Sequence, residues 1–156
     1  MSHKVGLLIT AVCALIVLSG CGSTAPSAAP TSPALANACG LVTNMDTLVG
    51  KTALGAPAGF RLNEVDRCIW TYAADPARSV GVSVAPLIAH VAAIESFGEG
   101  EKVPGLGDDA RWWTSSHQLS VAAGTEALQV DLELNDADNS KELAVSIAQA
   151  ALANLH

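Results

Sequence analysis

The residue whose setting points most directly to chemistry is Cys21. It directly follows the tripeptide Leu-Ser-Gly at positions 18–20, at the end of an apolar run over residues 5–18. His3 and Lys4 give this run a positive start, so the first part of the chain has the pattern of an export signal. The run is shorter than the roughly 20 residues that a membrane-spanning helix needs. No A-x-A-like site follows it, so a plain secretory signal does not explain the pattern.

Residues 18–21 match, at every position, the lipobox L-[AS]-[GA]-C of bacterial lipoproteins, and the chain resembles these proteins here. The resemblance implies that the thiol of Cys21 forms a thioether to diacylglycerol and that residues 1–20 are removed as a signal peptide. Two or more acyl chains, such as palmitate, give stable membrane anchoring. We therefore expect a lipid anchor at Cys21 and a location on the extracytoplasmic face of the cell membrane. Cys13 lacks small residues before it and leaves with the signal.

Two cysteines of the exported part, Cys39 and Cys68, form an even pair, which in an exported chain indicates a disulfide. Closing that loop of about 30 residues stabilises a fold by roughly 3 to 4 kcal/mol in the chain-entropy model. The rival interpretation is a metal site. Because no C-x-x-C spacing or nearby histidine supports a metal site, we expect the bridge.

Other residues that could carry chemistry do not form a site in the sequence. A serine hydrolase places its nucleophile on an elbow of the type G-x-S-x-G, and that motif is missing. His90, His117 and His156 are single and far apart, as packing or surface histidines are. The prediction is therefore no catalytic residue and no cofactor.

Three loops look like ligand sites but have simpler explanations. Residues 98–102 (Gly-Glu-Gly-Glu-Lys) lack the Ser or Thr that follows the lysine of a phosphate loop. Residues 135–140 lack the glycine and glutamate of a calcium loop, and a turn followed by a helix cap explains them. Asp108 and Asp109 are predicted to lie in a solvated turn. No metal ligand is predicted.

Trp112 and Trp113 are adjacent on an expected strand, so their side chains point to opposite faces of the sheet. Trp112 shares its side with Ala110, which favours the core. Trp113 shares its side with Arg111, whose burial without a partner would cost several kcal/mol. Two interpretations of Trp113 stay open, since a loop could cover it or it could form a contact surface with Arg111.

Composition defines the parts of the chain. Residues 21–37 comprise the lipidated cysteine and a stretch of Ser, Thr, Ala, Pro and Gly with one large apolar residue, which predicts a flexible linker. Residues 38–156 suit one compact domain. The net charge of −7 becomes −8 when Lys4 leaves with the signal. Because the chain is acidic and has no basic run, we expect no nucleic-acid partner.

The elements predict an α+β fold, an antiparallel sheet of about five strands with helices packed on one face. The first helical element spans 38–54, with a capping box from Thr43 to Asp46, and the last helix begins after an N-cap at Asn139. A second helix spans 87–97. Strands are expected at 68–72, 80–84, 110–115, 118–123 and 126–134, with a short one near 60–62; the last long strand alternates leucine or valine with polar residues.

Three short motifs carry a family resemblance. They are A-C-G-L-V-T at 38–43, C-I-W at 68–70 and V-P-G-L-G-D-D-A at 103–110, followed by an alanine-rich last helix. Together they resemble small actinobacterial (mycobacterial-type) secreted lipoproteins of unknown function. The resemblance implies the same α+β domain, a bridge between the two cysteines and a membrane address, and it implies no activity.

These observations lead to one expected function and one alternative. We expect a membrane-anchored, non-enzymatic cell-envelope lipoprotein that binds a protein partner or an apolar envelope molecule. The alternative is a cell-wall enzyme, or an accessory subunit of one, whose site the sequence does not reveal. A pocket without convergent polar groups would favour binding, and paired carboxylates with shifted pKa values would favour catalysis.

Overall fold

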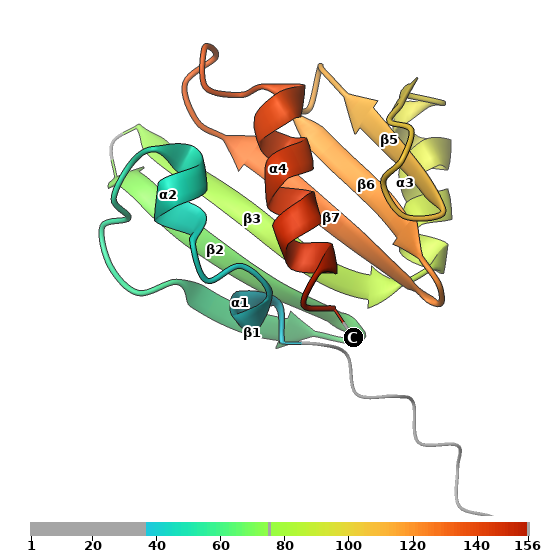
Figure 1. The fold of residues 1–156 in the computed structure, drawn as a ribbon, viewed down its shortest axis with the longest axis horizontal. Coiled ribbons are helices and arrows are strands. Elements are labelled where there is room, and N and C mark those ends of the chain that lie inside the picture. The colour runs from blue at the N-terminus through green and yellow to red at the C-terminus, as the bar shows by residue number, and fades with distance from the viewer. Residues whose placement is uncertain (1–36, 75, 156) are drawn as a thin grey trace, which may run out of the picture. The chain divides into compact units, whose positions relative to one another are not determined.

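The computed structural model describes residues 37–74 and 76–155. The signal peptide predicted at 1–20, the lipidation site Cys21 and nearly all of the linker at 21–37 lie outside these residues. The described part is an antiparallel sheet with the strand order β1-β2-β3-β7-β6-β5-β4 and four helices (Figure 1). The strands are β1 Ala58–Leu62, β2 Val65–Ala74, β3 Ala77–Pro86, β4 Glu101–Lys102, β5 Asp109–Trp113, β6 Gln118–Ala123 and β7 Glu126–Glu133. The helices are α1 Ala38–Leu41, α2 Met45–Val49, α3 Ile88–Phe97 and α4 Lys141–Leu152.

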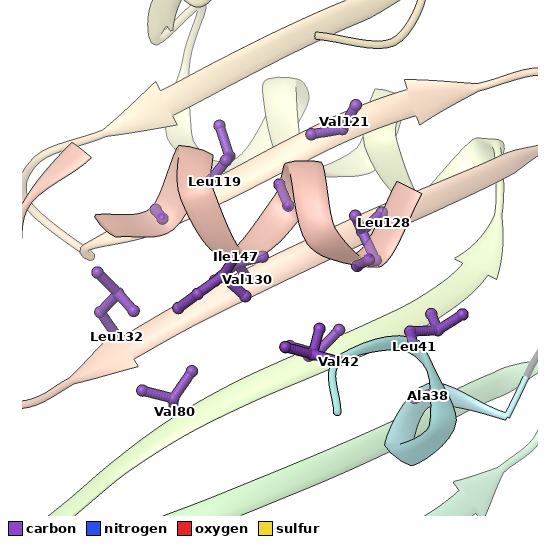
Figure 2. Close-up of a cluster of buried hydrophobic side chains, with 14 of the residues drawn as sticks. Ala38, Leu41, Val42, Val80, Leu119, Val121, Leu128, Val130, Leu132 and Ile147 are labelled. Carbon is purple, nitrogen blue, oxygen red and sulfur yellow. The ribbon is translucent and has the colours of Figure 1, made fainter. Parts of the chain in front are cut away.

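The main core lies between α4 and the sheet. Strand β7 turns Leu128, Val130 and Leu132 inward, each almost fully buried, so the alternation predicted for this strand is confirmed. Leu119 and Val121 of the paired strand β6 lie beside them (Figure 2). Helix α4 covers this apolar face with a stripe of small and branched residues, Ala144, Ile147, Ala148 and Ala151.

The first and the last helical regions differ from the sequence prediction. Helix α4 is capped by Ser140, whose hydroxyl accepts from the backbone N–H of Leu143. Asn139, the predicted cap, instead accepts from the backbone N–H of Leu134 and closes the preceding turn. The expected helical element at 38–54 is two short helices, α1 capped by Asn37 and α2, and no capping box forms at Thr43. The break follows from Val42, whose backbone is extended.

The predicted disulfide is confirmed. Cys39 of α1 is bonded to Cys68 of β2, with 5.0 Å between the two Cα atoms. The bridge passes beside Gly59 of the edge strand, where a Cβ atom would come within 2.9 Å of the Cys39 sulfur. It therefore joins the first helix to β2, the strand next to the edge of the sheet.

The fold class is correct in outline, and two of its details were wrong. The sheet has seven strands rather than about five: β1 is the short strand expected near 60–62, and β4 forms inside a predicted loop by pairing with β5. The helices also do not share one face, since α3 lies behind the sheet while α1, α2 and α4 lie in front of it (Figure 1). Among the described residues, no helix is long and apolar enough to cross a membrane.

Candidate functional site

Helix α3 buries a histidine and leaves two large apolar residues exposed, unlike an ordinary surface helix. His90 and Ala93 are its buried residues. Ile88 and Val91 point outward, and 68% of Ile88 is exposed. A surface helix normally buries such an apolar stripe against the core. Polar contacts therefore take a larger share in holding this helix on the sheet.

The sheet face under α3 explains this arrangement. Successive residues of a strand point to opposite faces, so Ser120 lies opposite to its core neighbours Leu119 and Val121. The cross-strand register places one row of polar residues along this second face: Arg67, Ser83, Gln129, Ser120 and Arg111. A helix that packs on such a row gains from hydrogen bonds rather than from apolar area.

A chain of hydrogen bonds joins α3 to this polar face. The Nδ1 atom of His90 lies 2.9 Å from the Oγ atom of Ser120, and its Nε2 atom lies 3.1 Å from the Oδ2 atom of Asp109. The same carboxylate oxygen accepts from Nε of Arg111 at 2.8 Å. Arg111 then donates from Nη1 to the backbone carbonyl of Glu99, at 3.0 Å, and to its carboxylate. Both ends of α3 are thus fixed to strands β5 and β6.

The charges in this chain balance one another. Arg111 is only 9% exposed, and its guanidinium is satisfied by Asp109 and Glu99, so its burial is not that of an unpaired charge. Burial raises the pKa of the Asp109 carboxyl, but hydrogen bonds from Arg111 and His90 outweigh this effect and hold that pKa below its ordinary value. The prediction of a solvated turn is correct for Asp108, which is exposed, and wrong for Asp109, which belongs to β5 and bonds to Arg111 and His90.

The residue types Ser120, His90 and Asp109 are those of a hydrolytic triad, but their geometry supports a positioning role. A triad needs a hydroxyl that can reach a substrate carbonyl. Ser120 is 0% exposed, and its hydroxyl lies beneath α3. The three side chains therefore serve here to attach the helix.

Trp113 contributes a second attachment of the same region. Its indole N–H donates to the carbonyl oxygen of Gly98 at 2.9 Å, and its ring lies 5.8 Å from that of Phe97. Gly100 lies so close to this ring that a Cβ atom there would be 2.8 Å from it. Trp113 could have been covered by a loop or exposed as a contact surface. In the structure a loop covers the ring, and only 4% of the residue is exposed.

Arg111 and Trp113, the predicted contact surface, are thus adjacent to α3 but lie beneath it and its following loop. They do not form an exposed surface in this structure, since their side chains are occupied by Asp109, Glu99 and Gly98. Direct contact of a partner with these two residues stays a prediction. What they support is the helix above them.

The outer surface of α3, defined by Leu87, which directly precedes the helix, and by Ile88 and Val91, carries exposed apolar side chains. Phe97 is half accessible, but its ring packs on Trp113 at the sheet side of the helix. Three other large apolar residues of the described part are exposed, Leu54 and, on the edge strand β1, Phe60 and Leu62. Apolar side chains gathered on one helix are typical of a surface that binds an apolar partner.

The remaining sequence candidates take structural roles. Residues 98–100 connect α3 to β4, and the carbonyl oxygen of Gly98 accepts from Trp113; Glu101 and Lys102, expected in a connector, form β4. In the 135–140 segment, Asp138 forms an ion pair with Lys51, and Asn135 accepts from Arg78. Across the part of the chain that is described, no group of three or more His, Cys, Asp or Glu side chains is placed to hold a metal ion.

The contact between His90, Ser120 and Asp109 could not be recognised from the sequence, because the three residues come from separate segments. Their sequence separations are 30 and 19 residues, and no spacing rule links them. The one available signal was the mixed face of the helix at 87–97, where a histidine stands among apolar residues.

Comparison with known proteins adds no further information on the site. No protein-family model, no curated protein and no solved structure matches this chain significantly.

Proposed function

We propose that this chain is a membrane-anchored, non-enzymatic lipoprotein of the cell envelope whose domain binds a protein partner or an apolar envelope molecule. The observation that supports binding is the outer surface of α3. Buried polar contacts attach this helix to the sheet, and Ile88 and Val91 face outward instead of packing in the core. These two side chains are therefore free to contact another molecule. The lipobox around Cys21 supports the anchor and the extracytoplasmic location.

The anchor is tested by replacing its acceptor. Cys21→Ala is expected to lose labelling by a palmitate analogue and to move from the detergent phase to the aqueous phase, because one lipidated residue carries the whole anchor. The matched control is Cys13→Ala, which changes a thiol in the part that the signal removes. Labelling and partition that are unchanged in Cys21→Ala would refute the lipoprotein proposal.

The binding surface is tested by site-specific photo-crosslinking in native envelope. A photoreactive side chain at Ile88 or Val91 is expected to capture a defined protein or lipid, because both positions face outward on α3. The control position is Gln149, which is exposed on α4 at the other face of the sheet. Ile88→Glu should abolish the product formed from Val91. Equal products from Ile88 and Gln149, or none from either α3 position, would count against this surface.

A further inference from the structure

A hollow of about 420 Å³ lies on the face of the sheet opposite to α3. Its lining residues come from the α1–α2 region, from the loop that leads to β1, and from Trp70 of β2. The volume falls in the range of small-molecule sites, roughly 300 to 1,000 Å³. Since it is remote from the outer surface of α3, what it binds is independent of the proposed function.

The clearest sign of a ligand is the indole nitrogen of Trp70. Trp112 donates to the hydroxyl of Thr114 at 3.1 Å, and Trp113 donates to the carbonyl oxygen of Gly98. Trp70 is only 5% exposed, yet none of the described residues accepts a hydrogen bond from its indole N–H. Trp70 lines the hollow, and its indole nitrogen is not among the fully enclosed unpaired polar atoms, so an atom from outside the domain can reach it. Buried tryptophans usually find an acceptor.

The walls define the chemistry of an occupant. Thr43, Asn44 and Thr47 offer hydroxyl and amide groups that both donate and accept hydrogen bonds. Asp46 adds a carboxylate whose position is fixed, because its Oδ1 atom accepts from the backbone N–H of Ala53 at 3.1 Å and from the Tyr72 hydroxyl at 3.3 Å. Neither lysine nor arginine is among the described residues that line the hollow, and this disfavours an anionic ligand.

A neutral sugar ring has the matching groups. Its C–H face packs on an indole and on apolar wall atoms such as those of Met45 and Pro57, while its hydroxyls pair with carboxylate, amide and hydroxyl groups. A sugar hydroxyl can also accept the unpaired N–H of Trp70. We propose that this hollow is a binding site for a neutral carbohydrate unit, with Trp70 as its base and Asp46 as its main acceptor.

The test follows the three indole N–H signals of the ¹⁵N-labelled full chain, one from each of its three tryptophans. The chain is held in a zwitterionic detergent, because a glycoside detergent would compete for the site. The probes are maltotriose, triacetylchitotriose and arabinotriose at about 10 mM, which fills even a millimolar site. At least one of them should shift the Trp70 signal and leave the signals of Trp112 and Trp113 unchanged.

Variants separate recognition from folding. Asp46→Asn and Trp70→Phe should each weaken binding of that sugar at least about tenfold by calorimetry, a change of roughly 1.4 kcal/mol. The matched control Trp113→Phe should bind as the parent chain does, and unshifted signals of the other tryptophans report an intact fold. No shift of the Trp70 signal with any probe would overturn the proposal. A shift with choline, a cationic probe, in place of all three sugars would overturn it as well.

Discussion

Replacing Trp113 by alanine is expected to destabilise the domain as much as replacing Trp112. Both side chains are almost fully buried, one on each face of the sheet, with 4% and 3% of the residues exposed. Truncation of a buried tryptophan to alanine costs about 3 to 5 kcal/mol through lost transfer free energy and the cavity that remains. From the sequence alone, Trp113→Ala would cost much less, because Arg111 on its side of the strand argued for an exposed face.

Two contacts of Trp113 contribute to the loss of unfolding free energy that is expected for Trp113→Ala. The ring contact with Phe97 contributes about 0.5 to 1.5 kcal/mol beyond area burial. The hydrogen bond to the carbonyl oxygen of Gly98 contributes little more, because Gly98 is exposed and water can replace the donor. Trp113→Phe, which keeps most of the ring volume, should therefore lose only about 1 kcal/mol.

The measurement is the free energy of unfolding in urea, followed by circular dichroism on the full chain, with amide hydrogen exchange as a second readout. Trp113→Ala should lower the protection of α3, because Trp113 holds the loop that follows this helix. Trp112→Ala should leave α3 protected relative to the rest of the domain, since its ring lies in the main core. If Trp113→Ala lowers the free energy of unfolding by less than about 1 kcal/mol, the ring is exposed. That result would refute the conclusion that Trp113 supports α3 and the loop after it.

Three further outcomes are expected. Replacing both Cys39 and Cys68 by serine should lower the free energy of unfolding by about 3 to 4 kcal/mol, and an equal melting curve for the oxidised and reduced parent chain would contradict this. The folded-state pKa of Asp109 lies below its ordinary value of 3.8, so its ionised form stabilises the fold above that pH and the gain is lost as the pH falls through the lower folded-state pKa. Asp109→Asn should hence flatten the acid limb of a stability profile, and an unchanged slope would speak against the ion pair. Gly107→Ala should cost more than about 1 kcal/mol in urea melts, because Gly107 has a φ of 60° and a Cβ atom there would clash with the Ala122 carbonyl oxygen.

The parts of the fold that could be predicted are those in which periodicity reports burial directly. Strand β7 alternates with the period of a half-buried strand, and α4 carries one continuous apolar stripe. The disulfide followed from the even count of cysteines after the predicted signal and lipidation site. The cap of α4 was misplaced by one residue because Asn139 and Ser140 are both good cap formers, and only the turn after β7 decides between them.

The parts that could not be predicted depend on contacts between distant segments. Strand β4 is two residues long and exists through its pairing with β5, so it leaves no pattern of its own. The face that α3 covers is decided by His90 meeting Ser120 and Asp109, although the outward apolar residues of the helix argue for the opposite orientation. Arg111 was expected to stay in water because its partners, Asp109 and Glu99, could not be recognised as partners in the sequence.

The strand order has a kinetic implication. Strands β1 to β3 form one meander of neighbouring hairpins, and β4 to β7 form another. Within the described sheet, the ladder between β3 and β7 joins the two meanders, pairing Ser79 with Glu133 at one end and Pro86 with Glu126 at the other. Pairing of segments so distant in sequence is slow, because loop closure must precede any gain from the contacts. The disulfide lies within the first half of the chain, so it cannot shorten this search. Each half can form its hairpins early, and closure of the β3–β7 ladder, with α4 docking across it, is the step that should limit the folding rate.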